Sequence, residues 1–207
     1  YVCLGEPQNP IYDVPVFGAP ATSPQSEATP IAPICPYGIT KAAGLNLCRY
    51  YRRTHDLFCS AGILYTHEAP RRGPQFLSRR IVQTAIAIRD GAADELVIGN
   101  LDAVVDWGWA PDYVEAMEQI LELDAAGDFI VATGRGTRVG EFVTAVFDAL
   151  GRAPGGAVRE DRGRIVRDLR TVPLIGDHAS LSAATGWRPS HDIGDIARLM
   201  VAAALGE

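Results

Sequence analysis

The stretch of sequence that decides the fold covers residues 37–65 and reads YGITKAAGLNLCRYYRRTHDLFCSAGILY. Its first part, residues 37–54, has apolar side chains at helical spacing, which predicts an amphipathic helix. Its last part, residues 57–65, is almost continuously apolar, which is typical of a parallel strand that is buried on both faces. A helix followed directly by a buried strand is the repeating unit of α/β proteins.

The same alternation continues toward the C-terminus. Apolar spacing and glycines after the last turn predict further helices over residues 76–90, 111–123, 139–150, 179–185 and 192–205. Short apolar runs predict strands over residues 95–98 and 129–132. This order predicts an α/β fold with a mostly parallel sheet and flanking helices.

The first 36 residues differ from the rest in composition. Eight of the 14 prolines lie between Pro7 and Pro36. Proline removes a backbone donor and restricts the residue before it, so a helix is excluded here. We expect an extended segment that lies over the rest of the protein.

The bulk composition excludes several classes of protein. The chain has 207 residues and a net charge of −6, which argues against nucleic-acid binding. Its four cysteines have no zinc-binding spacing, so we expect no metal, free thiols and a reducing cytoplasm. No apolar run approaches the length of about 18 residues that a membrane span needs.

The local motif with the most specific chemistry is the pair Tyr37 and Lys41. A spacing of four places both side chains on one face of a helix. An ammonium group beside a phenol favours the phenolate, which suits a proton acceptor or donor. Alone, this spacing more often marks an ordinary surface pair.

Other motifs follow in a fixed order: SPQSEATP (23–30), CPY (35–37), GILYTHEAPRRG (62–73), GNLD (99–102), DWG (106–108), DYVEAM (112–117) and VATG (131–134). Together with the Tyr–Lys pair, they resemble the GDP-mannose 4,6-dehydratases, a family of extended short-chain dehydrogenases/reductases. The resemblance extends from about Phe17 to the C-terminus. It implies a Rossmann-type domain that binds NADP and a smaller lobe that holds a sugar nucleotide. It also implies that Tyr37 is the catalytic base and that Lys41 assists it and holds the nicotinamide ribose.

The sequence also departs from the pattern of that family. The glycine-rich turn expected near the start, which holds the cofactor pyrophosphate, is not found before Phe17. Val14 and Pro15 occupy the places of a Ser/Thr and a catalytic Glu. A different glycine-rich turn at residues 134–140 has the wrong spacing for a dinucleotide. The resemblance therefore predicts a truncated Rossmann-like sheet with a small C-terminal α/β lobe.

Further departures affect the expected substrate site. Val104 and Val105 replace a basic pair, Thr66 replaces an Asn, and Trp109 replaces a His. Each lost charge-assisted hydrogen bond to a phosphate costs about 1.5–3 kcal/mol of binding free energy. These apolar replacements favour a hydrophobic small molecule. The residues expected to bind the substrate are Thr66, Arg80, Val104, Val105, Trp109 and Arg167.

Taken together, these departures predict a repurposed protein with no nicotinamide cofactor. It would be a cyclase, isomerase or lyase that acts on a largely apolar small molecule, with Tyr37 and Lys41 as its catalytic residues. One alternative is an NADP-dependent GDP-mannose 4,6-dehydratase whose front end is missing or supplied by another chain. A second alternative is a non-catalytic partner subunit.

The resemblance also implies a division into domains and a dimer. The segments would be a proline-rich part (1–36), a Rossmann-like remnant with interleaved substrate-lobe segments (37–135) and a substrate-type lobe (136–207). We expect a homodimer through the helices at 37–54 and 76–90.

Overall fold

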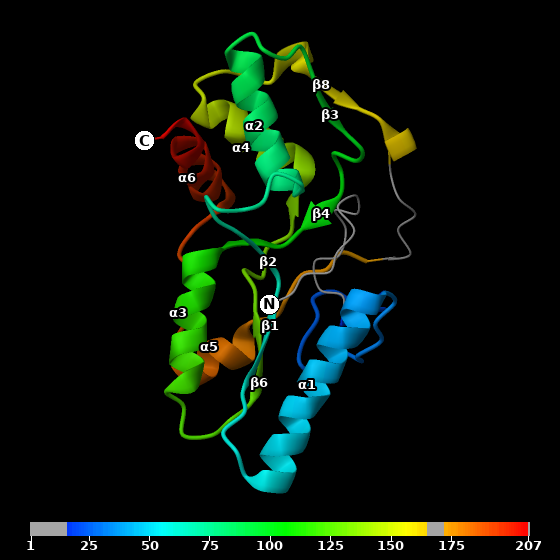
Figure 1. Ribbon diagram of the computed structural model, residues 1–207, viewed down its shortest axis with the longest axis vertical. Helices are drawn as coiled ribbons and strands as arrows, with labels where there is room; N and C mark the ends of the chain where they lie inside the picture. The colour runs from blue at the N-terminus through cyan, green and yellow to red at the C-terminus, as the bar shows by residue number, and fades with distance from the viewer. Residues whose placement is uncertain (1–15, 165–171, 207) are drawn as a thin grey trace.

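The computed structural model describes residues 16–164 and 172–206. Two groups of elements lie one above the other in Figure 1, joined by several strands that cross between them. The lower group contains α1 (Pro36–His55), β1 (Ala61–Leu64), α3 (Ala110–Leu121), β6 (Asp128–Val131) and α5 (Ala179–Thr185). The upper group contains α2 (Leu77–Arg89), β3 (Leu96–Ile98), α4 (Val139–Ala149), β8 (Val158–Glu160) and α6 (Ile193–Leu205).

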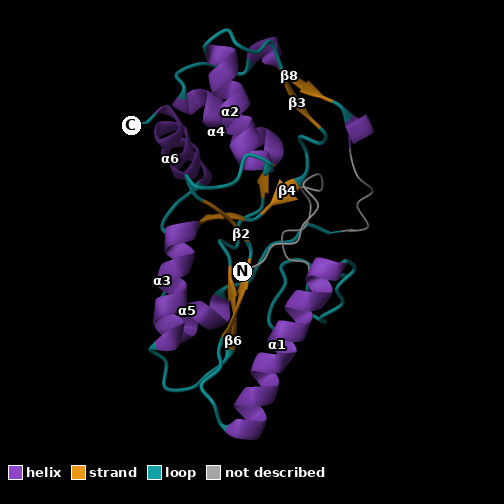
Figure 2. Ribbon diagram, in the orientation of Figure 1, coloured by secondary structure: helices purple, strands orange, loops and turns teal. Residues whose placement is uncertain are grey.

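Four short strands lie between the two groups: β2 (Thr66–Glu68), β4 (Val104–Val105), β5 (Trp107–Trp109) and β7 (Thr137–Arg138). Two single turns of 3₁₀ helix, Gly155–Ala157 and Arg162–Arg164, flank β8. Figure 2 shows how short all the strands are beside the helices. β1 pairs with β6, β2 with β5 and β3 with β8 in parallel, whereas β4 and β7 are antiparallel. The prediction of an α/β fold with mostly parallel strands is confirmed.

The strands β1 and β6 are covered by helices on both faces. Ile130 of β6 packs with Ile63 in a cluster that includes Ala42 of α1. The next residue, Val131, points the other way and packs with Tyr113 of α3 and with α5. Two covered faces explain why these strands carry no polar side chain except Asp128, which forms ion pairs with Arg49 and Arg52 of α1. Figure 1 shows α1 on one side of the strands and α3 and α5 on the other.

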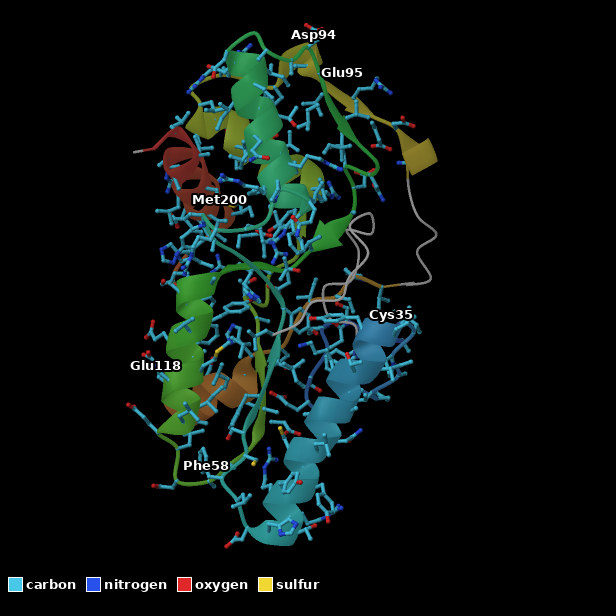
Figure 3. The ribbon with its side chains drawn as sticks, viewed as in Figure 1. Cys35, Phe58, Asp94, Glu95, Glu118 and Met200 are labelled. Carbon is cyan, nitrogen blue, oxygen red and sulfur yellow. The ribbon has the colours of Figure 1, made fainter. Side chains whose placement is uncertain are left out.

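The upper group has its own core, formed almost entirely by helices. Ile81 of α2, Phe142 of α4 and Met200 of α6 are fully buried and pack in one cluster. Met200 is labelled on α6 in Figure 3.

No helix within the described residues is both long enough and apolar enough to span a membrane.

One sequence-based expectation is refined by the structure, and another is not tested by it. The strand expected over residues 57–65 is only Ala61–Leu64, because its partner β6 offers four paired residues and Leu57 and Phe58 are exposed. The expected division at residues 36 and 135 stays a prediction. The chain does pass repeatedly between the two groups, so each group consists of segments that are distant in sequence.

The described part of the proline-rich segment, residues 16–35, contains no helix, as predicted. Phe17 at its start is buried against the lower core. The backbone N–H of Ala32 donates to the carbonyl of Val16 at 3.0 Å and closes a loop. The chain turns at Gly18, which has a φ of +60° and lies directly against the carbonyl of Ala32.

Gly18→Ala is expected to lower the free energy of unfolding by about 3 kcal/mol, because a left-handed backbone and a steric clash act together. A Cβ at this position would lie 2.0 Å from the carbonyl oxygen of Ala32. The control is Gly91→Ala, where φ is +73° but no atom lies within 4 Å of the added Cβ. The control should lose only about 1 kcal/mol. Urea denaturation checks the difference, and equal losses would contradict this account.

Candidate functional site

The first turn of α1 is fixed by its cap. Cys35 has an extended backbone, and its Sγ accepts a hydrogen bond from the N–H of Gly38 at 3.3 Å. Pro36 follows in the first helical turn. A backbone N–H at this position has no partner within the helix, so proline costs no hydrogen bond here. Figure 3 labels Cys35 at the end of α1 that lies nearer the crossing strands. The cap therefore places Tyr37 at this end of the lower group.

Tyr37 and Lys41 stack on one face of α1, as predicted from their spacing. Nζ of Lys41 lies 5.3 Å from the ring centroid of Tyr37. Both side chains are half-buried. The hydroxyl of Thr40 donates to the carbonyl of Tyr37 at 2.8 Å, within the same turn. A phenol and an ammonium held together in this way are suited to hold hydroxyl groups and to transfer a proton.

Four of the predicted substrate-binding residues lie in the crossing strands. Thr66 of β2 is buried and pairs with Trp107, while Trp109 at the end of β5 pairs with Glu68. Val104 and Val105 of β4 are half-buried and pair with Arg138 and Thr137 of β7.

The other two predicted substrate-binding residues do not lie in the crossing strands. Arg80 is exposed on α2, in the upper group. Arg167 lies outside the described residues, as do Val14 and Pro15.

A buried carboxylate, Asp106, connects the crossing strands to two distant segments. Its Oδ1 accepts from the N–H of Thr133 at 2.9 Å and from the Thr133 hydroxyl. Its Oδ2 accepts from the N–H groups of Gly134 and Gly176, each at 3.1 Å. Burial raises the pKa of Asp106 above its ordinary value, and these hydrogen bonds partly offset the rise. The charge is thus stabilised by donors rather than by a cation.

A second buried carboxylate, Asp112, fixes the segment that leads into α6. It accepts from the N–H and hydroxyl of Ser190 at 3.0 and 2.8 Å, and from Nδ1 of His191 at 2.9 Å. The carbonyl of Asp112 also accepts from Nε1 of Trp187 at 2.9 Å. The start of α3 is thereby tied to the chain that returns to the upper group.

Gln25 anchors the N-terminal segment and is fully buried. Its Oε1 accepts from the hydroxyl of Tyr65 at 2.9 Å and from the N–H of Ile175 at 3.0 Å. Its Nε2 donates to the carbonyls of Thr22 and Pro173. Burial, and then the charge of Asp106, raise the pKa of Tyr65 above its ordinary value, so this phenol stays a proton donor.

The roles of these buried polar side chains were not evident from the sequence. Asp106 lies in the DWG motif, which was recognised as a family marker without a role for its carboxylate. Gln25 lies in the SPQSEATP motif, again without a role for its side chain, and its partners Pro173 and Ile175 are about 150 residues away. Glu68, in the GILYTHEAPRRG motif, is buried, and its Oε2 accepts a hydrogen bond from the hydroxyl of Ser78 at 2.6 Å. In the described ranges no three His, Cys, Asp or Glu side chains gather as metal ligands.

Two solved structures define the class of fold. RMD from Pseudomonas aeruginosa, complexed with NADPH, superposes with a TM-score of 0.82 and 22% identity over 92% of this chain and 63% of that one. The dTDP-glucose 4,6-dehydratase from Bacillus anthracis, in complex with NAD, gives a TM-score of 0.80 and 19% identity over 94% of this chain and 60% of that one. The fold is therefore the Rossmann-type fold of the short-chain dehydrogenases/reductases.

The family follows from sequence similarity. The family model described as GDP-mannose 4,6 dehydratase matches residues 15–200. GDP-mannose 4,6 dehydratase 2 of Caenorhabditis elegans is 34% identical over 90% of this chain and 53% of its own length. GDP-mannose 4,6 dehydratase 2 of Arabidopsis thaliana is 38% identical over 90% of this chain and 49% of its own length. The chain belongs to the GDP-mannose 4,6 dehydratase family, and it spans about half the length of these curated relatives.

The expectation of a protein without a nicotinamide cofactor is overturned by these findings. The chain belongs to a dehydratase family, and two structures of the same fold are complexes with NADPH and NAD. The expectation relied on the missing glycine-rich turn. Since the chain spans only about half of its relatives, that absence carries no conclusion about the cofactor.

Asp106→Asn is expected to lower the free energy of unfolding by about 2–4 kcal/mol, because an amide NH₂ would face backbone N–H donors at one of the two oxygen positions. Asp124→Asn is the matched control, because Asp124 is exposed. Chemical denaturation measures both. A loss below about 1 kcal/mol for Asp106→Asn would show that the carboxylate does not hold these segments together.

Proposed function

We propose that this chain is part of an enzyme of the GDP-mannose 4,6-dehydratase type, which acts on a nucleotide sugar with a nicotinamide nucleotide as its cofactor. The observation that carries the proposal is the Tyr37–Lys41 pair, half-buried on one face of the first turns of α1. Membership of the dehydratase family supports it.

The residues present are chemically suited to such a cofactor. A hydroxyl and an ammonium on one helix face match the hydroxyl groups of a ribose, which accept and donate hydrogen bonds. Lys41 would hold the nicotinamide ribose, as the resemblance implies, with the Tyr37 phenol beside it. When it is bound, a nicotinamide nucleotide supplies a hydride acceptor that later returns the hydride.

The role of the protein in the reaction is proton transfer and positioning. The phenol oxygen of Tyr37 would remove the proton from the sugar hydroxyl that is oxidised, and the Lys41 ammonium would stabilise the phenolate. Both side chains are fixed by a helix that is capped by Cys35 and packed through Ala42 against the strand layer. A base on a rigid element stays in place without further ordering during the reaction.

Tyr37→Phe in the full protein is expected to lower kcat about 10²–10⁴-fold while KM changes only a few-fold, because the phenyl ring keeps the packing and removes the transferable proton. Tyr50→Phe on the exposed part of the same helix is the matched control and should leave kcat unchanged. Steady-state kinetics with GDP-mannose and NADP provide the measurement. Unchanged turnover in Tyr37→Phe would remove the tyrosine from the mechanism.

The apolar pair in β4 bears on the choice of substrate. Val104 and Val105 are half-buried and supply no charge at a place where the resemblance implies phosphate contacts. A less highly charged substrate than a GDP-sugar is therefore the second candidate, within the same cofactor-dependent chemistry.

The two candidates are separated by adding charge to β4. If a GDP-sugar is the substrate, Val105→Arg should tighten the binding of GDP-mannose about tenfold, because a guanidinium pairs with phosphate oxygens. Val114→Arg on the exposed side of α3 is the control, and it should have no effect. Calorimetric titration measures both variants. Weaker binding or none in Val105→Arg would favour the less charged substrate.

We also propose a homodimer through α1. Leu47, Tyr50 and Tyr51 on this helix are each at least 44% exposed, which leaves an apolar face without cover in the described part of the chain. Helix α2 lies in the upper group and packs on α4 and α6, so the proposal now rests on α1 (Figure 1).

Leu47→Glu is expected to convert the dimer into monomers at micromolar concentration, since a charge would be buried in the interface. The control is Leu121→Glu on α3, where the leucine is 69% exposed, and it should leave the dimer intact. Light scattering gives the mass of each variant. A monomeric wild-type protein would refute the dimer.

A further inference from the structure

We infer that a pocket between the glycine-rich turn at residues 134–140 and the start of α6 binds the phosphate group of a small organic phosphate. The pocket has a volume of about 260 Å³. It is lined by residues from β5, the turn after β6, and the first turns of α6: Trp107, Thr133, Arg135, Thr137, His191, Asp192, Ile193, Gly194 and Arg198. None of these residues belongs to the Tyr37–Lys41 pair, so the inference is independent of the proposed function.

The position of the pocket follows from the fold. The turn begins where β6 ends, and the parallel strands of α/β proteins present their ligand sites at their carboxyl ends. Figure 1 shows the start of α6 above α3, on the opposite side of the molecule from α1. The pocket therefore lies on a different part of the molecule from α1.

One wall of the pocket is rigid. The ring of Trp107 packs on Phe142 of α4 with a centroid distance of 4.9 Å, and both rings are buried. Beside it, the hydroxyl of Thr133 donates to Asp106 and accepts from the N–H of Arg135 at 3.1 Å. These bonds hold the backbone of the turn in place, so Arg135 projects from a fixed support.

The positive groups at the pocket come from both walls. Arg135 lies on the turn, and Arg198 lies on the second turn of α6. His191 has its Nδ1 bonded to the buried carboxylate of Asp112 at 2.9 Å, which fixes the orientation of the ring beside the pocket. Two guanidinium groups and an imidazole thus surround one small volume.

Two carboxylates also lie here, Asp192 in the pocket lining and Asp195 in the first turn of α6, and each accepts a backbone hydrogen bond. The carboxylate of Asp192 accepts from the N–H of Asp195 at 2.9 Å, and Asp195 accepts in return from the N–H of Asp192 at 3.0 Å. Arg198 forms an ion pair with Asp195 and therefore stays oriented at the pocket. A Cβ at Gly194 would lie 3.2 Å from Oδ1 of Asp192 and 3.4 Å from Nη1 of Arg198, so the glycine lies close to both side chains.

Size and chemistry together select the ligand. Pockets for drug-sized molecules have volumes of about 300–1,000 Å³, so the enclosed part of this pocket suits a smaller group. Guanidinium groups recognise phosphate oxygens through paired hydrogen bonds, and the hydroxyl of Thr137 adds a neutral donor. Trp107, whose ring is largely buried against Phe142, contributes a small apolar part of the lining. A sugar phosphate has both a phosphate group for the guanidinium groups and a small polar ring that fits the remaining volume.

The test uses the full protein with glucose 6-phosphate, inorganic phosphate and uncharged glucose as probes. Binding is followed by calorimetry and by the chemical-shift changes of backbone amides. Glucose 6-phosphate is expected to bind, with inorganic phosphate weaker and glucose not detected. The shift changes should include Thr137, Gly194 and the indole N–H of Trp107.

Arg135→Ala should weaken the binding of glucose 6-phosphate at least tenfold. Arg198→Lys, which keeps the charge near Asp195 but removes the planar fork, should weaken it several-fold. Arg152→Ala is the matched control, because Arg152 is an exposed arginine just beyond α4, away from the pocket lining. The inference is overturned if none of the probes binds at about 10 mM, or if Arg135→Ala binds as well as Arg152→Ala does. Shift changes confined to another surface would also overturn it.

Discussion

The constraint on which the rest of the structure depends is the burial of the Asp106 carboxylate. It has no cation beside it in the described part of the chain, so its charge is stabilised by the N–H groups of Thr133, Gly134 and Gly176 and by one hydroxyl. A buried carboxylate fixes the positions of the groups that donate hydrogen bonds to it, because the loss of any donor would leave the charge without sufficient stabilisation. The segments at 106, 133 and 176 therefore meet at one point, and the crossing strands and the pocket beside α6 are both built on it.

The helices and the fold class were predictable because their causes are local. Apolar spacing predicted every α-helix within a few residues, and the Tyr37–Lys41 contact follows from a separation of four on one helix. The short strands β2, β4, β5, β7 and β8 were missed. Two or three residues are too few to show alternation, and partners far along the chain decide their pairing.

The buried polar contacts were predictable only in part, for the same reason. The amide of Gln25 is satisfied by groups around residue 174, and Asp112 by groups around residue 190. In both cases the stabilising partner is brought close by the tertiary fold and leaves no pattern in the neighbouring sequence.

The error about the cofactor has a different origin. A positive motif such as the Tyr37–Lys41 pair keeps its meaning in a partial sequence, whereas a missing motif does not.

The interleaving of the two groups of elements has a consequence for how the protein folds during synthesis. The upper core needs α6, which ends at Leu205, and the lower core needs Leu174 and α5. Neither core is complete until its last segment has been made, so neither group of elements can fold while the residues between its first and last segments are still being made. Contacts of such long sequence separation also slow folding. The apolar faces of the earlier helices therefore stay exposed until α5 and α6 have been synthesised, and these faces are the surfaces that a chaperone would bind at that stage.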